Sequence, residues 1–394
     1  MSEYLSRRAV AVRPSVTFTL STLAKKLKAE GKPILDLSLG EPDMNTPEPV
    51  VEAARRALDE GHFHYTPTAG VPALLAAIAE VYSQRLKLPV EPSMTMATQG
   101  AKQALFNALA TVTDPGDTIA VLQPYWVSFV EQAHALGLQV ELVPCPAENA
   151  FRPDFAVLKR VLSRGVKLLL INSPCNPTGA AFDAATMRTL AELVQESGTL
   201  LVSDEIYEDI VYEERGHLSP LHLVPQLFDR CCVVTGLSKG FAMTGWRVGF
   251  SIAPKWWTAA MTRLQGHTTS HIAALTQQAA ITALRRRDLI APLLSTFVRR
   301  RALVLDLLAG VPGLSAHEPE GAFYLFLDLS NYLGSKGPAQ DTLSLAQWLL
   351  EEHNLVLVPG DAFGQPGYLR LSFAASEAVL EESFERLAFA LAQL

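Results

Sequence analysis

Short apolar runs alternate with longer amphipathic segments through the middle of the chain. Four of these runs are rich in Val, Ile and Leu and have the length of buried strands; they cover residues 118–122, 167–171, 199–203 and 232–235. Apolar positions at helical spacing cover residues 71–87, 101–112, 184–196 and 275–287. Strands that alternate with helices in this way predict βαβ units, a mostly parallel sheet and an α/β fold.

The pattern changes from about residue 292 onward. A basic helix around Arg300 is followed by strand-like residues 322–327 and 368–372 and by a closing helix from Glu377. This order is typical of a smaller α+β domain. We therefore expect three parts, which are an N-terminal arm that forms part of the small domain (residues 1–45), a large domain (46–290) and a small C-terminal α+β domain (291–394).

Composition and charge restrict the function. The chain has 394 residues, of which 33 are Lys or Arg and 40 are Asp or Glu, so its net charge is −7. This balance argues against nucleic-acid binding, which needs a clustered basic excess. No apolar run reaches the roughly 18 residues that span a bilayer, so we expect neither a nucleic-acid nor a membrane partner.

Four cysteines show no metal-binding or disulfide spacing; they are Cys145, Cys175, Cys231 and Cys232. We expect reduced thiols, no metal site and a cytoplasmic location. The basic N-terminus faintly resembles an organellar presequence, and a structural arm is the preferred interpretation.

Polar or aromatic side chains follow each of the four predicted strands. In chain order these side chains are Trp126, Asn176, Asp204 with Tyr207, and Lys239. Ligands of a doubly wound sheet bind outside the carboxyl ends of its strands. We therefore expect these groups to converge on one pocket.

A glycine precedes the predicted helix 101–112. Gly100 leaves the free N–H groups of Ala101 and Lys102 open to an anion, and the helix dipole favours phosphate there. The segment matches neither a Walker loop nor a G-x-G-x-x-G fingerprint, so a plain helix-capping glycine is the alternative.

The segment 236–249, GLSKGFAMTGWRVG, matches the whole pyridoxal-phosphate attachment signature of class I and II aminotransferases. The chain resembles the class I family, in particular bacterial aspartate (aspartate/prephenate-type) aminotransferases, from Arg7 through residues 39–43 to Arg370. This resemblance implies the type I fold of pyridoxal-phosphate-dependent transferases. In that fold a large domain carries a mostly parallel seven-stranded sheet between helices, beside a smaller α+β domain.

The resemblance implies pyridoxal 5′-phosphate as cofactor and gives the matched residues roles. Lys239 forms a Schiff base with the cofactor and then moves the substrate proton, so that the amino group passes through pyridoxamine phosphate. Asp204 keeps the pyridine nitrogen protonated. Tyr207 and Asn176 bind the phenolic oxygen, and Trp126 stacks on the ring.

The phosphate site follows from the same resemblance. Arg247, Ser238 and the backbone of residues 100–102 bind the phosphate. Tyr65 reaches the phosphate of a neighbouring subunit, which implies a homodimer with shared active sites. Many relatives carry a serine where this chain has Gly236, so one phosphate contact is in doubt.

The substrates implied are an L-amino acid, with aspartate as the first choice, and a 2-oxo acid such as 2-oxoglutarate. The residues implied for binding them are Arg370 for the α-carboxylate, assisted by Gly40, Asn176 and Trp126, and Lys102, Ser15 and Thr17 for a second carboxylate. Tyr324 is expected near this site.

Three alternatives remain open. A prephenate/glutamate or aromatic aminotransferase is one, because residues 265–270 resemble members with prephenate activity, although His271 stands where asparagine is usual. A pyridoxal-phosphate-dependent lyase of the same fold is another. The third is a non-catalytic sensor that holds the cofactor.

Overall fold

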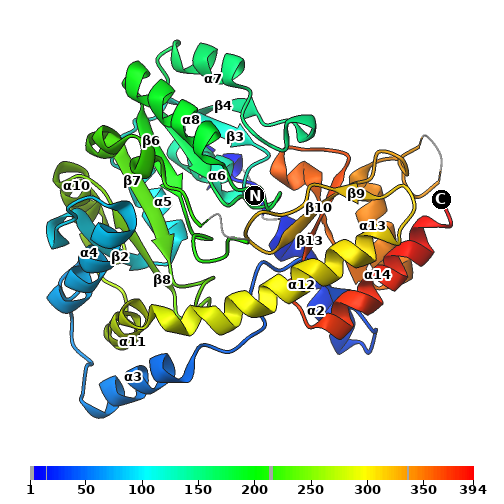
Figure 1. Ribbon diagram of the computed structural model, residues 1–394, viewed down its shortest axis with the longest axis horizontal. Helices are drawn as coiled ribbons and strands as arrows, with labels where there is room; N and C mark the ends of the chain where they lie inside the picture. Colours follow the sequence, from blue (N-terminus) through cyan, green and yellow to red (C-terminus); the bar gives the residue numbers. More distant parts are fainter. Residues whose placement is uncertain (1–3, 15, 213–215, 335–336) are drawn as a thin grey trace.

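The computed structural model describes residues 4–14, 16–212, 216–334 and 337–394 (Figure 1). Its main feature is a seven-stranded sheet with the order β2-β8-β7-β6-β5-β3-β4. The strands are β2 (Thr95–Gln99), β3 (Thr118–Gln123), β4 (Gln139–Pro144), β5 (Leu168–Asn172), β6 (Leu200–Asp204), β7 (Cys231–Gly236) and β8 (Val248–Ile252). Only β8 runs antiparallel to its neighbours, so the sheet is mostly parallel, as predicted.

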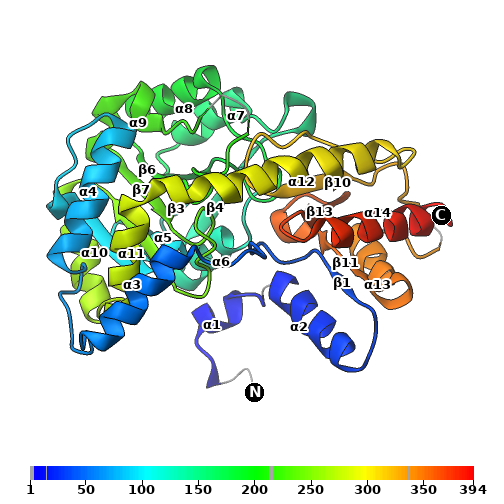
Figure 2. The same ribbon diagram turned by 60° about the horizontal axis from the view of Figure 1, so that its bottom comes forward.

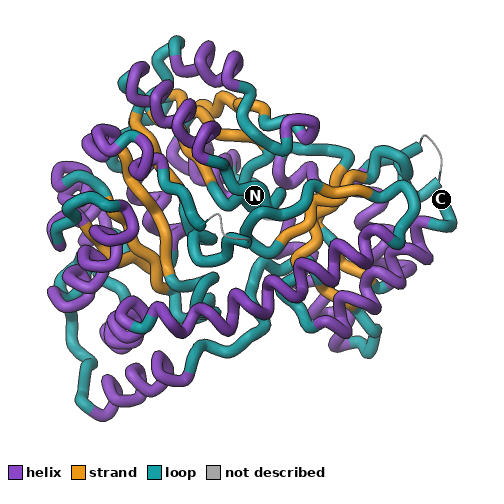
Figure 3. Tube along the Cα trace, viewed as in Figure 1, coloured by secondary structure: helices purple, strands orange, loops and turns teal. Residues whose placement is uncertain are grey.

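Helices cover both faces of this sheet (Figure 3). They are α4 (Pro72–Leu86), α5 (Ala101–Ala110), α6 (Ser128–Leu136), α7 (Phe155–Leu162), α8 (Ala184–Ser197), α10 (Lys255–Gly266) and α11 (Ala274–Arg285). Helix α3 (Glu48–Asp59) packs against α11, and the short α9 (Pro220–Leu223) packs against α8. N-cap side chains determine where some of these helices begin. Asp154 accepts backbone N–H bonds at the start of α7, and Asp183 does the same for α8.

Alternate residues of the central strands enter different cores. In β7, Cys231 and Val233 join one apolar cluster, whereas Cys232 and Val234 join another. A strand points successive side chains to opposite faces, so the sheet is buried on both sides. The neighbouring thiols of Cys231 and Cys232 therefore face away from each other.

The C-terminal part has its own sheet and core. Strands β12 (Val358–Pro359), β13 (Tyr368–Ser372), β10 (Tyr324–Asp328) and β9 (Ser315–Ala316) form an antiparallel sheet in that order. Helices α12 (Ala291–Ala309), α13 (Thr342–His353) and α14 (Glu377–Leu391) pack against it. In Figures 1 and 2, the long α12 runs from beside α11 to the group around α14.

The N-terminal segment joins this second group. Strand β1 (Leu35–Asp36) pairs in parallel with β11 (Leu355–Val356), and α2 (Val16–Ala29) packs against the chain at β11 and β12 (Figure 2). Helix α1 (Arg7–Ala11) lies against α6. These contacts support an N-terminal arm shared with the small domain, while the boundaries at residues 45 and 290 stay predictions.

The apolar pattern located the four predicted strands to within one residue at each end. The predicted strand 322–327 begins later, because Ala322 has a positive φ of 55° and strand geometry starts only at Tyr324. The helix predicted over 275–287 ends at Arg285, where a short 3₁₀ turn from Arg287 leads into α12. No helix in the described part of the chain combines the length and apolarity that a membrane crossing needs.

Candidate active site

The carboxyl ends of the central strands open into a cavity of about 520 Å³. Groups from every predicted strand end line it, together with residues of the N-terminal segment and of the C-terminal sheet. The predicted site residues among them are Thr17, Gly40, Ala101, Lys102, Trp126, Asn176, Asp204, Tyr207, Ser238, Lys239, Arg247 and Arg370. The expected convergence at the carboxyl edge of the sheet is therefore observed.

Lys239 follows β7 and lines the cavity. Its Nζ donates a hydrogen bond to the carbonyl oxygen of Gly40. Burial lowers the pKa of Lys239 to about 8; Glu41 opposes this shift, and the cations of Arg247 and Arg370 add to it. The lowered pKa leaves roughly a tenth of the amine neutral at pH 7, far more than for an ordinary lysine, and the neutral amine is the form that attacks or accepts a proton.

Asp204 ends β6 and is only 3% exposed. Its Oδ1 accepts the backbone N–H of Ile206 at 3.1 Å, and no cationic side chain among the described residues bonds to it. Burial raises the pKa of Asp204 to about 7, and the charge of Glu205 adds to the shift. A buried carboxylate of this kind fits a ligand that brings its own positive charge, such as a protonated ring nitrogen.

The start of α5 and the guanidinium of Arg247 meet at one end of the cavity. Gly100 has a φ of 78°, and a Cβ there would lie 2.4 Å from Nη2 of Arg247. A Cβ at Gly249 would lie 2.3 Å from the backbone nitrogen of Ala101. The two glycines therefore let a fixed cation and a helix N-terminus come together, with Ser238 also on the cavity wall. This donor set fits a phosphate group.

Arg370, from β13, is 2% exposed. Its Nη1 donates to Oδ1 of Asn176 at 2.9 Å, and its Nη2 donates to the carbonyl oxygen of Ser38. Its buried Nε has no hydrogen-bond partner among the described residues. Burial lowers the pKa of this guanidinium, which is the cost of a desolvated charge. An incompletely paired buried cation beside a cavity fits a substrate carboxylate.

Two phenols share a hydrogen bond in the cavity wall. The hydroxyl groups of Tyr207 and Tyr324 are 2.7 Å apart, and the guanidinium of Arg370 lies 4.7 Å from the centre of the Tyr324 ring. Tyr324 was expected near the site, and the cavity lining includes it. Its bond to Tyr207 was not predicted, because no local pattern links positions 117 residues apart.

The predicted site residues not yet described are Lys102, Tyr65 and Ser15. Nζ of Lys102 lies 4.8 Å from the centre of the Trp126 ring, inside the cavity wall. Tyr65 does not line the cavity within this chain; it is 93% exposed and contacts the ring of His271 edge-on at 5.6 Å. Ser15 lies outside the described residues.

A steric contact explains why the chain has Gly236 where many relatives have serine. A Cβ there would lie 2.7 Å from the carbonyl oxygen of Val248 and 2.8 Å from Cα of Gly249. A serine at this position would therefore push β7 away from β8. The close approach of the two strands explains why glycine stands here.

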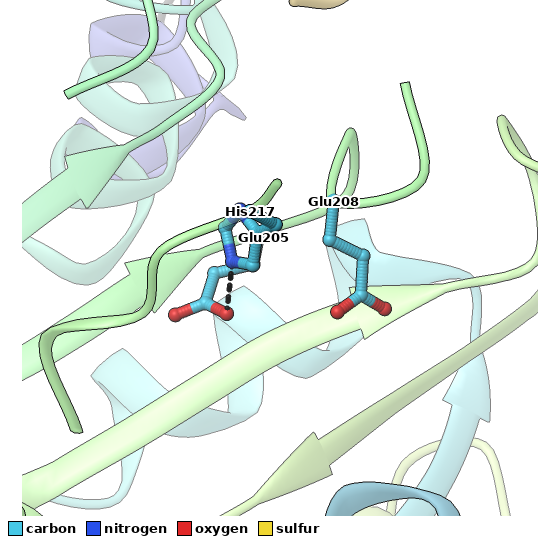
Figure 4. Close-up of side chains that lie close together, drawn as sticks. All are labelled: Glu205, Glu208 and His217. Carbon is cyan, nitrogen blue, oxygen red and sulfur yellow. Dashed lines mark hydrogen bonds and ion pairs between the residues drawn. The ribbon is translucent and has the colours of Figure 1, made fainter. Parts of the chain in front are cut away.

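Two carboxylates and a histidine form a second buried cluster, outside the cavity lining (Figure 4). Nε2 of His217 lies 2.7 Å from Oε2 of Glu205, and Ser203 and Ser219 donate to Oε1 of Glu205. Glu208 accepts bonds from Tyr82 and Thr235 and pairs with Arg85. Although burial opposes it, Glu205 raises the pKa of His217. Protein partners thus already occupy these groups, and the cluster does not fit a metal site.

Comparisons with known proteins agree with this fold and site. Residues 32–387 match the model of the family described as aminotransferase class I and II. The aspartate/prephenate aminotransferase of Thermus thermophilus is 40% identical over 389 residues, which cover 98% of both chains. The bifunctional aspartate aminotransferase and glutamate/aspartate-prephenate aminotransferase of Petunia hybrida is 38% identical over 98% of this chain and 82% of its own.

Solved structures extend the similarity to three dimensions. The aspartate aminotransferase from Thermus thermophilus with maleate superposes with a TM-score of 0.92 at 39% identity, covering 98% of this chain and 99% of that one. The aspartate aminotransferase from Rhizobium meliloti gives 0.94 at 36% identity and covers 99% of both chains. The chain belongs to the class I and II aminotransferase family.

Proposed function

We propose that this protein transfers the amino group of L-aspartate to 2-oxoglutarate with pyridoxal 5′-phosphate as cofactor. The observation that carries the proposal is that one cavity holds the amine of Lys239, the carboxylate of Asp204 and the guanidinium of Arg370. The names of the aspartate aminotransferases described above support the choice of substrate.

The cavity offers a partner for each part of the cofactor. Asp204 would pair with the ring nitrogen, and Tyr207 with Asn176 would bind the phenolic oxygen. Arg247, Ser238 and the backbone of residues 100–102 would bind the phosphate, and Trp126 would stack on the ring. When bound, this cofactor supplies a carbonyl that takes up the amino group and a ring that withdraws electrons from the substrate Cα.

The side chains of the protein supply binding and proton transfer. Arg370 and Asn176 would hold the α-carboxylate and so fix the position of Cα in the cavity that Lys239 also lines. Nζ of Lys239, with its lowered pKa, would take the proton from Cα and pass it to the cofactor carbon that accepts the amino group. Asp204 would be ionised beside the ring nitrogen of the bound cofactor, because a positive charge there would offset the cost of burying the carboxylate.

The second carboxylate of a dicarboxylic substrate needs another cation. We propose that Lys102, which lies over the Trp126 ring, binds this second carboxylate. Thr17 and Ser15 are the proposed hydroxyl donors. Prephenate also carries a second carboxylate, and the names of the relatives from Thermus thermophilus and Aquifex aeolicus include it. A prephenate-dependent activity of the same site is therefore the second candidate.

The cofactor site is shared between two copies of the chain in this proposal. The hydroxyl of Tyr65 would reach the phosphate in a partner subunit, and the exposure of Tyr65 at the surface of the single chain supports this placement. The four thiols of the chain are unpaired and agree with a reducing compartment, for which we propose the cytoplasm.

The visible absorbance of the purified protein with pyridoxal phosphate tests the proposal. Addition of L-aspartate should replace the long-wavelength band with the band of the amine form of the cofactor, and 2-oxoglutarate should restore it. The Lys239→Ala variant should lose turnover, whereas the Lys255→Ala variant, altered at an exposed lysine, should keep it. A band that no amino acid changes would contradict transamination and point to a sensor. Release of ammonia from aspartate, or formation of alanine with carbon dioxide, in the absence of an oxo acid would point to a lyase.

A further inference from the structure

The distance between the hydroxyls of Tyr207 and Tyr324 shows a hydrogen bond, but either phenol could be its donor. Each phenol has one proton to donate, and the oxygen atoms are 2.7 Å apart. Among the described residues, each hydroxyl has the other as its sole hydrogen-bond partner. One proton therefore lies between the two oxygens, and the other is left for a ligand. The direction of this bond decides which phenol presents that proton to the cavity.

Two observations favour Tyr324 as the donor. The cation of Arg370 lies 4.7 Å from the Tyr324 ring centre, and a nearby positive charge makes a phenol a stronger acid. Burial raises the pKa of both phenols, and Arg370 opposes this shift at both. The remaining influences separate them, because Tyr324 and Asp204 raise the pKa of Tyr207 further, whereas burial alone raises the pKa of Tyr324. The more acidic phenol is the better hydrogen-bond donor.

The surrounding backbone holds the Tyr324 hydroxyl where this bond requires it. A Cβ at Gly40 would lie 2.0 Å from the Tyr324 oxygen, so only glycine leaves room for the hydroxyl. The carbonyl oxygen of the same residue accepts the hydrogen bond of Lys239. The Tyr207 ring packs edge-on against Tyr324, with ring centres 5.8 Å apart. The bond is therefore part of a fixed and buried arrangement.

We propose that Tyr324 is a positioning residue of this site, whose hydroxyl donates to the oxygen of Tyr207 and so directs the single proton of Tyr207 into the cavity. The inference rests on the proposed function, in which Tyr207 faces the phenolic oxygen of the cofactor. Tyr207 then both accepts from Tyr324 and donates to that oxygen. Because hydrogen bonds in a chain polarise one another, Tyr207 becomes a stronger donor to a negatively charged oxygen.

A pH titration of the visible absorbance of the holoenzyme tests the inference without relying on activity. The variants are Tyr324→Phe, Tyr207→Phe and the double variant. A neutral hydrogen bond is worth about 1 kcal/mol, so loss of the Tyr324 hydroxyl should raise the apparent acid dissociation midpoint of the bound cofactor by about half to one pH unit. Tyr207→Phe should raise the midpoint further. Because Tyr324 acts through Tyr207, adding Tyr324→Phe to Tyr207→Phe should leave the midpoint unchanged.

Tyr212→Phe is the matched control. Tyr212 is also buried, and its hydroxyl donates to the carbonyl oxygen of Ala322, away from the cavity lining. Its loss should leave the midpoint unchanged. An unshifted midpoint in Tyr324→Phe, an equal shift in the Tyr207→Phe background, or an equal shift in Tyr212→Phe would overturn the inference. A wild-type protein without a cofactor band would instead overturn the proposed function, and the inference with it.

Discussion

Arg370 and Asn176, which are 194 residues apart in the chain, meet in the wall of the cavity through a 2.9 Å hydrogen bond. The arginine comes from the small antiparallel sheet and the asparagine from the loop after β5. The contact joins the two sheets at the place where a substrate carboxylate is proposed to bind. Its geometry therefore makes substrate affinity depend on both parts of the fold.

Replacing Arg370 with Ala should lower kcat/KM for L-aspartate by about 100-fold or more, because truncation of one member of a buried charged pair costs a few kcal/mol. Steady-state kinetics measures the loss. Arg370→Lys should recover only part of it, since a lysine cannot replace the bonds to Asn176 and Ser38 together. Arg286→Ala, which alters an exposed arginine, should have no effect. A loss of only a few-fold in Arg370→Ala would contradict a carboxylate-binding role.

Replacing Lys102 with Ala should change substrate preference more than overall activity. A hydrogen bond to a charged group is worth about 1.5–3 kcal/mol, so KM for aspartate should rise about 10- to 100-fold. KM for an apolar amino acid should change little, because such a substrate has no second carboxylate. The ratio of kcat/KM for the two amino acids is the measurement. Equal effects on both substrates would contradict the assignment.

The sequence pattern predicted the central strands because each is a short apolar run buried on both faces. The pattern missed β2, β4 and β8, although the resemblance implied seven strands. Strand β4 lies at the sheet edge, where all but one of its side chains are exposed or half-exposed, and β2 (TMATQ) carries three polar residues. Neither strand shows the continuous apolar run of a doubly buried strand.

The site residues also differ in whether a local sequence pattern or a long-range contact determines their position. Asp204 and Lys239 were predictable from residues alone, since Asp204 directly follows an apolar run and Lys239 comes four residues after another. Arg370 needed a resemblance, because its place depends on the antiparallel register that sets it opposite Phe326 in β10. The contact of Tyr324 with Gly40 joins positions remote in sequence. No periodicity or local motif encodes such a contact.

The cofactor-free protein should become less stable as the pH rises through the titration range of Asp204. The pKa of this carboxyl is raised from 3.8 to about 7 by burial, so the stabilisation from its protonated form is complete below pH 3.8 and is lost as the pH approaches 7. The Asp204→Asn variant has no carboxyl group to ionise at this position, so it does not lose stability in this way as the pH rises. Its stability advantage over the wild type should grow from near zero at pH 4 to at most about 4 kcal/mol above pH 7.

Urea unfolding of the cofactor-free wild type and of Asp204→Asn between pH 4 and pH 8 measures this difference. Added pyridoxal phosphate should reverse the order, because the ring nitrogen then gives the aspartate a positive partner. A stability difference that does not change with pH would show that Asp204 is already ionised in the cofactor-free protein.

The buried cluster of Glu205, Glu208 and His217 should contribute to stability without a metal ion. Glu205→Gln leaves His217 without its charged partner and should lower the free energy of unfolding by about 3–5 kcal/mol. Glu141→Gln, at a partly exposed pair with Arg164, should cost at most about 1 kcal/mol. Urea unfolding measures both. A chelator that lowers the melting temperature of the wild type, but not that of Glu205→Gln, would contradict this assignment.

A methyl group at Gly40 should collide with the Tyr324 hydroxyl, because the Cβ position lies 2.0 Å from that oxygen. Gly40→Ala should therefore lower the free energy of unfolding by about 1–3 kcal/mol, as overpacking usually does, and should lower kcat for aspartate as well. In the Tyr324→Phe background the nearest atom is the ring carbon Cζ at 3.1 Å, which the methyl group almost clears. The stability cost of Gly40→Ala should then be smaller by about 1 kcal/mol or more, which a double-mutant cycle in urea measures. Equal costs in both backgrounds would show that the two residues are not in contact, and that something other than the Tyr324 hydroxyl requires glycine at position 40.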